Sequence, residues 1–221
     1  MDIELAAETI GHIGFFPITN TLLVTWITMI LLISSSFIAT RKMQAIPAGI
    51  QNFFELIVEI GFGVVDDLAH FKAKTFFPFV MTFFLFIATA NWIGLFPGLG
   101  TIGFTEIING KEMFVPYLRT INADLNTTLA LALISAVTTH FFAVKYLGIK
   151  NYLGHWFTLN PIFLFVGLLE IVGEFTKIVS LSFRLFGNIF AGEVVLSTIG
   201  SIFAFVLPLP FYFLEIIVGF V

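Results

Sequence analysis

A long apolar stretch near the end of the chain contains charged residues that a membrane segment usually lacks. The stretch runs from about residue 161 to about residue 202 and includes Arg184, one lysine and three glutamates. A charged group in hydrocarbon costs at least a few kcal/mol, so such residues usually face a protein interior or a water-filled path. We therefore interpret this stretch as a functional site.

Most polar side chains of this stretch fall on one side of a helix. With about 100° between successive residues, a stripe lies within about 80° of Arg184 and consists of Glu170, Glu174, Lys177, Ser180 and Asn188. Glu193 falls about 180° from Arg184, on the opposite side. Such a helix would present a cation to one partner and a carboxylate to another.

A structural ion pair is the alternative explanation for part of the stripe. Lys177 follows Glu174 by three residues and Glu170 by seven, and these spacings bring side chains together on a helix. Arg184 has no acid three or four residues away in the sequence. The structural interpretation therefore stays open for Lys177, whereas Arg184 points to function.

The same stretch resembles a known family. The string FTKIVSLSFRLFGNIFAGE, from Phe175 to Glu193, is similar to the signature of subunit a of the F-type ATP synthase, bacterial or plastid-like. That subunit is the membrane stator that faces the rotating ring of c subunits. Further similar strings are NWIGLFPG at 91–98, ADLNTTLALAL at 123–133 and LPLPFYFLEIIVGF at 207–220. The resemblance thus covers nearly the whole chain beyond the first helix.

Composition indicates a membrane protein independently of the resemblance. Apolar residues make up 58% and charged residues 11% of the 221 residues, which is typical of polytopic membrane proteins. The chain has no cysteine for disulfides or thiolate chemistry. A net charge of −4 without a basic patch argues against a nucleic-acid partner. No cofactor is expected.

Apolar runs and their flanking charges divide the chain into segments. A run of about 20 residues is long enough to cross a hydrocarbon core of about 30 Å, and Arg41 and Lys42 after the first run place the amino terminus outside. The expected segments are a first span at 18–40, an interfacial helix at 47–71, spans at 76–96 and 122–144, a long helix at 161–202 and the start of a last helix at 205–221.

The fold class that follows is an all-α polytopic membrane protein in a single membrane domain. We expect two to three conventional spans, one interfacial amphipathic helix and a pair of long helices. Because about 40 residues of helix measure about 60 Å, the 161–202 helix would be strongly tilted in a core of about 30 Å. The resemblance implies that the tilted pair faces a rotor ring.

The segment at 47–71 is acidic, which argues against a span. Its polar residues share one helical face and are Asn52, Glu55, Glu59, Asp66 and His70. Helices that bind lipid headgroups usually carry Lys and Arg there, so a basic protein partner fits this face better than anionic lipid. The resemblance implies the peripheral stalk subunit b, and a merely solvated face is the alternative.

Other polar residues near helix ends have structural and functional interpretations that both stay open. Asn91 suits a hydrogen bond between helices or a place in the proton path. Asp124 suits a helix N-terminus electrostatically, whereas the resemblance implies that Asp124 and Asn126 line an outer aqueous inlet. His140 and His155 have no partner at metal-ligand spacing, so no metal site is predicted and both are interpreted as incidental.

The resemblance implies a role for Arg184 as the rotor-facing cation between two offset aqueous half-channels. Arg stays protonated, and a nearby Arg lowers the pKa of a carboxylate by about 1 to 3 units. It would therefore promote proton release from the rotor carboxylate and block a direct proton leak. A Lys would be a poorer permanent charge, since its pKa shifts readily when it is desolvated.

Glu193 and Glu215 are predicted to form a proton relay on the outer side. We expect burial and mutual repulsion to let at least one of them hold a proton near neutral pH. In the resembling family the position of Glu215 carries His or Glu. A hydrogen-bonded pair that only joins two helices is the alternative.

Two departures from the family pattern concern the last two helices. Ile178 stands where the family usually has Pro, which predicts a straighter helix. The chain stops at Val221, before a Gln that the family typically carries, so the last helix is expected to be truncated and a partner of Arg184 to be missing.

The predicted function is a proton-conducting, non-catalytic stator subunit of ATP synthase. Its expected partners are the c-subunit ring, stalk subunit b, other ATP synthase subunits and the lipid bilayer. The expected location is the bacterial plasma membrane, with the plastid thylakoid as the alternative. The competing readings are the same subunit coupled to sodium and an independent secondary transporter, although inverted repeats typical of transporters are not visible.

Overall fold

The computed structural model describes residues 7–96, 102–108, 111–156, 161–202 and 207–220, and they are mostly helical. They form two compact units, one of residues 7–121 with the last turn of the final helix, and one of residues 122–218. In the described ranges, three segments are long and apolar enough to cross a membrane: Asn20–Thr40, Ile50–Gly94 and Leu125–Leu147. The prediction of an all-α polytopic membrane protein is confirmed.

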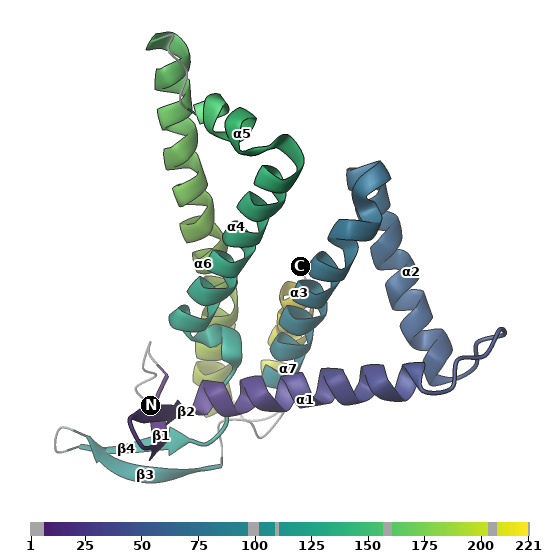
Figure 1. Cartoon of the computed structure of the whole chain (residues 1–221). Helices are drawn as coiled ribbons and strands as arrows, with labels where there is room; N and C mark the ends of the chain where they lie inside the picture. Colours follow the sequence, from purple (N-terminus) through teal and green to yellow (C-terminus); the bar gives the residue numbers. More distant parts are fainter. Residues whose placement is uncertain (1–6, 97–101, 109–110, 157–160, 203–206, 221) are drawn as a thin grey trace. The chain divides into compact units, whose positions relative to one another are not determined.

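The first unit combines three long helices with two short hairpins (Figure 1). Its elements are β1 (Thr9–Ile13), β2 (Phe16–Thr19), α1 (Asn20–Thr40), α2 (Ile50–Ala69), the 3-10 helix η1 (His70–Lys72), α3 (Ala73–Gly94), β3 (Gly103–Ile108) and β4 (Lys111–Pro116). Each hairpin is antiparallel, β1 with β2 and β3 with β4. No strands were predicted from the sequence, because both hairpins are short and their strands have only four to six residues.

Asn20 ties both hairpins to the start of α1. Thr19 caps this helix, and its hydroxyl accepts a hydrogen bond from the Leu22 amide at 3.3 Å. The buried Asn20 amide donates to the Pro116 carbonyl at 3.4 Å and to the Glu8 carboxylate at 3.3 Å. A small apolar core lies beside this junction and contains Val24, Ala90 and Ile121, with Ile93 and Leu118 packed against it.

Helices α2 and α3 pack against each other along one face of each. Gly61 of α2 lies against the side chains of Met81 and Phe77, so the two backbones come close there. Phe62 and Phe77 add an edge-to-face ring contact with centroids 5.3 Å apart. The face of α2 that packs in this way is apolar, and its polar residues lie on the rest of the helix.

The second unit is built on one long helix. Its elements are α4 (Leu125–Leu147), α5 (Ile149–Trp156), α6 (Pro161–Ile202) and α7 (Pro208–Phe220), preceded by the 3-10 helix η2 (Ile121–Ala123) at its boundary. The stretch predicted to be a single long helix is α6, with 42 residues. Helix α4 runs along α6, and α5, which the sequence analysis did not identify, packs against both.

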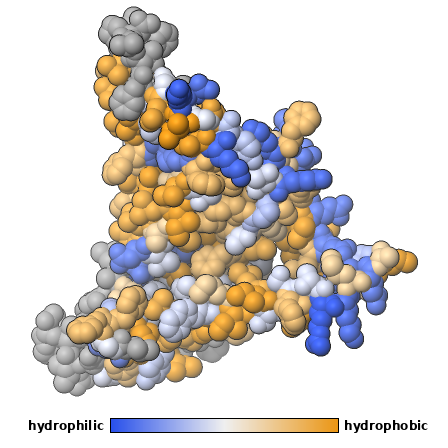
Figure 2. Space-filling view, in the orientation of Figure 1, coloured by the Kyte–Doolittle hydropathy of each residue, from blue (hydrophilic) through white to orange (hydrophobic). Residues whose placement is uncertain are grey.

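Outward-facing side chains are apolar on most helices. Figure 2 shows hydrophobic residues over large parts of the visible face. On α1 alone, Ile30 is 65% exposed, Ile33 69% and Phe37 64%. Apolar exposure on this scale marks a surface that another apolar phase covers, and for these spans that phase is the lipid bilayer.

Candidate functional site

The polar stripe of α6 is exposed around Arg184. Ser180, Arg184 and Asn188 lie at four-residue spacing and are all exposed. Ser182, Phe186 and Ile189 lie on another side of the same helix and are buried. The Ser182 hydroxyl lies 3.2 Å from the hydroxyl of Thr128 on α4, so α4 covers this second side. The packing within this unit thus leaves the Arg184 side of α6 accessible.

Apolar side chains lie beside Arg184 next to the polar stripe. Leu181 is 47% exposed and Phe183 is 53% exposed, so the cation is flanked by hydrophobic side chains. Among the residues that the structure describes, none forms an ion pair with Arg184. An exposed cation with apolar side chains beside it suits a partner surface that is apolar and carries a carboxylate.

Lys177 has a partner on its own helix. Its ammonium group lies 2.6 Å from a carboxylate oxygen of Glu174, with Lys177 73% and Glu174 26% exposed. Pairs as exposed as this one contribute about 0 to 1 kcal/mol. The ion pair that the sequence left open is therefore formed, whereas the described part of the chain offers Arg184 no such partner.

Glu193 and Glu215 come together on a different side of α6. Glu193 is half-buried, and Glu215 of α7 is only 5% exposed. The Glu215 carboxylate lies against the backbone of Gly192, where an added Cβ would overlap with it. The two carboxylates are close enough to repel each other when both are charged. The structure thus brings together the two acids that the sequence placed 22 residues apart.

Two further candidates, Asn91 and Asp124, occupy structural positions, and a third, Asn126, lies on the surface. Asn91 is buried and donates from its amide to the carbonyl of Gly219 at 2.8 Å, which ties α3 to the last turn of α7. Asp124 is the N-cap of α4. Its side chain accepts hydrogen bonds from the backbone N–H of Asn126 at 3.0 Å and from the Thr127 hydroxyl at 3.3 Å. Asn126 is exposed. The hydrogen-bonding and capping interpretations are therefore observed in the fold.

One polar contact was missed by the sequence analysis. His140 of α4 and Tyr152 of α5 are hydrogen-bonded, with 2.6 Å between the imidazole Nδ1 and the phenol oxygen. His140 was interpreted as incidental because it has no partner at metal-ligand spacing in the sequence. Without α5 in the expected segments, no sequence signal pointed to this contact. The side chain of His155 lies outside the described residues.

The acidic residues of α2 are mostly exposed. The side chains that point away from the packed face include two polar neighbours of these acids and are Asn52, Glu59, Asp66 and His70. Glu55 accepts a hydrogen bond from the side-chain amide of Gln51 at 2.7 Å. Beside them runs a second exposed stripe that is apolar and consists of Phe53, Leu56, Ile60 and Val64. Within the described part of the chain, no group of three or more His, Asp or Glu residues is arranged to hold a metal ion.

A comparison with known families decides the identity of this arrangement. The family model described as the ATP synthase A chain matches residues 22–221. The chain belongs to the ATP synthase subunit a family. The resemblance noted in the sequence is thereby confirmed.

Curated relatives agree with this assignment. The ATP synthase subunit a of Moorella thermoacetica is 34% identical over 210 residues, which cover 95% of this chain and 86% of the relative. The subunits a of Geobacter sp. strain M21 and of Citrifermentans bemidjiense are each 36% identical over 218 residues, or 97% of this chain and 86% of the relative. A member of the subunit a family is a component of ATP synthase that works with the other subunits of that complex, and its apolar helices embed it in a membrane.

Proposed function

We propose that this member of the subunit a family is the proton-conducting stator of a bacterial ATP synthase. It forms two offset aqueous half-channels beside the ring of c subunits. The observation that carries the proposal is the exposure of Arg184, between apolar side chains, on a helix that holds Glu193 on another side. The chain itself catalyses no chemical step and moves ions for the complex.

Arg184 would act on the carboxylate of the passing rotor. An ionised acid does not easily enter lipid, yet it has to release its proton between the half-channels. Arg keeps its charge and lowers the pKa of a nearby carboxylate by about 1 to 3 units. Its permanent positive charge also opposes direct passage of a proton from one half-channel to the other. The apolar residues beside Arg184 suit contact with a hydrophobic rotor surface.

Glu193 and Glu215 would serve the outer half-channel. Two carboxyl groups that repel each other when both are ionised bind and release protons as a pair. Repulsion favours the state in which one of the two holds a proton. Such a pair can accept and return a proton near neutral pH, which a relay group has to do. Asp124 and Asn126, at the start of α4, are assigned to the outer inlet. Asn91 of α3 is assigned to the proton path, and so is the stripe on α6, which consists of Glu170, Glu174, Lys177, Ser180 and Asn188.

The transported ion is proposed to be a proton. A sodium-coupled subunit a is the second candidate, since a relay of carboxylates can also contact a cation. Passive flux through vesicles at constant pH separates the two. Proton flux that is independent of sodium concentration supports the proposal, and flux that requires sodium replaces it with the second candidate.

The location that we propose is the bacterial plasma membrane with the amino terminus outside. The relatives named above come from bacteria. Arg41 and Lys42 are exposed after α1, and Lys145 and Lys150 flank the turn between α4 and α5. Positive residues concentrate on the cytoplasmic side of membrane proteins, so both turns are assigned to the cytoplasm.

The decisive experiment removes the charge of Arg184 in the complete complex. Arg184→Ala is expected to abolish ATP synthesis driven by a proton gradient while the complex still assembles in the membrane. Arg184→Lys should restore only a small part of the rate, because a desolvated Lys is a poorer permanent charge. Arg41→Ala, which removes an exposed cation at the end of α1, is the matched control and should retain the wild-type rate. Near wild-type synthesis in Arg184→Ala would refute the stator function.

The acidic face of α2 is proposed to hold the basic part of the peripheral stalk. The triple variant Glu55→Lys, Glu59→Lys and Asp66→Lys is expected to release the stalk at moderate salt and to leave the ring contact intact. A variant that keeps the charges, with Glu55→Asp, Glu59→Asp and Asp66→Glu, is the control. Recovery of complete complexes from the charge-reversed variant would show that this face is only solvated.

A further inference from the structure

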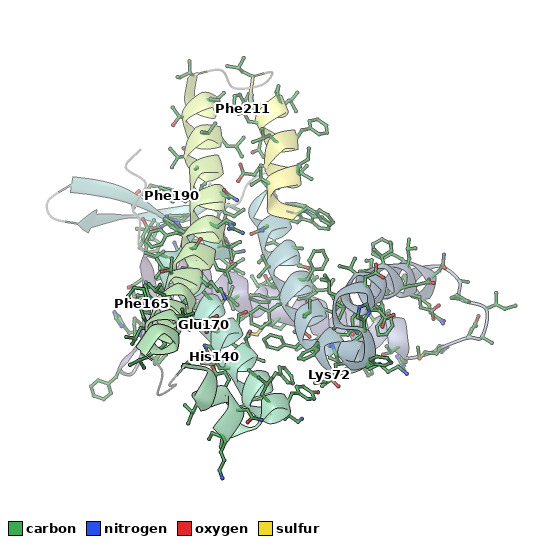
Figure 3. The ribbon with its side chains drawn as sticks, turned by 90° about the horizontal axis from the view of Figure 1, so that it is seen from above. Lys72, His140, Phe165, Glu170, Phe190 and Phe211 are labelled. Carbon is green, nitrogen blue, oxygen red and sulfur yellow. The ribbon has the colours of Figure 1, made fainter. Side chains whose placement is uncertain are left out.

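A compact polar cluster lies where α4, α5 and α6 meet. His140 Nδ1 and the Tyr152 hydroxyl are 2.6 Å apart, and Trp156 packs against both rings with centroid distances of 5.8 Å and 4.9 Å. Figure 3 shows Glu170 of α6 close to His140 of α4 at this junction. Helix α5 is thus tied to α4 by the hydrogen bond between Tyr152 and His140, and Trp156 of α5 packs against both rings.

Two acids of α6 act on this pair. Burial raises the pKa of the Tyr152 phenol, and the negative charges of Glu174 and Glu170 raise it further. Tyr152 therefore stays protonated across the physiological range. Glu174 and Glu170 therefore lie near enough to Tyr152 for their charges to act on its phenol.

The cluster lies on the cytoplasmic side of Arg184. Along α6, Glu170 precedes Arg184 by about 21 Å, and Glu193 follows Arg184 by about 14 Å, at about 1.5 Å per residue. Lys145 and Lys150 flank the turn between α4 and α5, and positive residues mark the cytoplasmic side. The pair Glu193–Glu215 and the cluster therefore lie on opposite sides of the cation.

We propose that His140 and Tyr152, together with Glu170 and Glu174, form a proton-exchange site at the cytoplasmic end of the inner half-channel. The proposal rests on the proton-conducting function proposed above. His140 is the group that takes up and releases the proton. Tyr152 is a positioning residue that orients the imidazole.

The chemistry requires only water as the exchanging partner. In the tautomer that we assign, Nδ1–H of His140 donates to the Tyr152 oxygen, which leaves the lone pair of Nε2 available. A proton from channel water forms an N–H bond at Nε2 while the O–H bond of a hydronium ion breaks. Release into cytoplasmic water reverses this step, so the pair returns to its starting state. Imidazole suits this exchange because it changes charge between pH 5 and pH 8.

The charged groups nearest the pair come from three helices, α4, α5 and α6. From α6 they are Glu170 and Glu174, of which Glu174 is partly neutralised by Lys177 at 2.6 Å. Lys145 of α4 and Lys150 of α5 are exposed at the ends of their helices.

Inside-out vesicles from which the catalytic head has been stripped test the site, because the medium then sets the cytoplasmic pH. Passive proton flux is driven by a potassium diffusion potential between pH 5.5 and 8. His140→Gln should flatten the pH profile and slow the flux about tenfold, less than the roughly 10²- to 10⁴-fold of a positioned acid–base group, because water can partly replace it. Added imidazole buffer should restore the flux in His140→Gln.

Tyr152→Phe keeps the ring and its packing and removes only the hydroxyl. Tyr152→Phe should change the pH profile of the flux in the same direction. It allows the site to be tested even if the complex with His140→Gln does not assemble. The matched controls are His12→Gln and Tyr117→Phe, which alter exposed residues of the first unit. Both controls should match wild type with and without imidazole.

The outcomes separate this site from the proposed function. Arg184→Ala is measured for ATP synthesis in parallel, with the head in place. Loss of synthesis in Arg184→Ala, together with a wild-type pH profile in His140→Gln and Tyr152→Phe, would refute the exchange site and leave the stator function standing. A slower flux that imidazole does not restore would reduce the pair to an anchor for α5 and also refute the site. Normal synthesis in Arg184→Ala would overturn both.

Discussion

Arg184 and Glu193 lie on the same helix but in opposite environments. Arg184 is exposed between Leu181 and Phe183, without an ion-pair partner among the described residues. Glu193 is half-buried and faces Glu215 of α7 across the close approach at Gly192. The two residues are separated by nine positions, which places them on opposite sides of an α-helix.

This difference distinguishes a site that requires a partner from one that the chain completes itself. A cation on an accessible apolar face can act only on a charged group that a partner protein brings next to it. Glu193 and Glu215 lie close to each other within the chain, and the packing of α7 against α6 sets the distance between them. Substitutions at Arg184 should therefore affect coupling to the rotor, whereas substitutions at the glutamates should affect proton delivery even without rotation.

The largest expected effect within this comparison comes from Glu193→Gln. It removes one carboxylate of the pair and should slow passive proton flux by roughly 10²-fold or more, the lower range for loss of an acid–base group. Glu215→His should be tolerated, because imidazole also exchanges protons near neutral pH. Asp67→Asn, which neutralises an exposed acid of α2, is the control. Unchanged flux in vesicles carrying Glu193→Gln would make the pair a structural joint.

An intermediate effect is expected from Gly192→Ala. The added Cβ would overlap with the Glu215 carboxylate, so α7 or the carboxyl group has to move. Overpacking of this kind costs about 1 to 3 kcal/mol, and we expect both a lower thermal midpoint of the complex and slower flux. Gly173→Ala adds the same atom on the same helix with nothing within 4 Å. If both variants behave alike, the close approach at Gly192 has no role in proton delivery.

The smallest expected effect comes from Ser182→Ala, on the covered side of α6. It removes the contact with the Thr128 hydroxyl at 3.2 Å, and hydrogen bonds between membrane helices contribute about 0.6 kcal/mol on average. The complex should lose a little thermal stability and keep its proton flux. Ser34→Ala, on an exposed position of α1, should change neither quantity. A large loss of flux in Ser182→Ala would mean that the covered side also takes part in conduction.

Much of α6 could be predicted from the sequence because its information is local. The apolar run has no proline after Pro161, which predicts one helix over 161–202, and α6 has these bounds. The helical repeat alone places Ser180 and Asn188 beside Arg184 and puts Glu193 opposite. The long string around Arg184 also identified the family, which the comparisons confirm.

Contacts between distant residues could not be predicted in the same way. His140 and Tyr152 are 12 residues apart and meet only because α5 folds back against α4. Asn91 and Gly219 are 128 residues apart, and a helical repeat says nothing about such a pair. The two hairpins were missed for a related reason, since strand pairing depends on partners outside each short segment.

The sequence by itself therefore determined the membrane class, the long helix and the arrangement of polar residues around that helix. These properties follow from hydrophobicity and from the helical repeat, and both are read along one continuous segment. The tertiary structure alone decided that Ser182 is covered by α4 and that Arg184 is left accessible. The pair of Glu193 and Glu215 was predicted, and the structure supplies the close approach of α6 and α7 at Gly192. Burial requires a second helix to lie against the first, and the position of that second helix depends on how the side chains of both pack together.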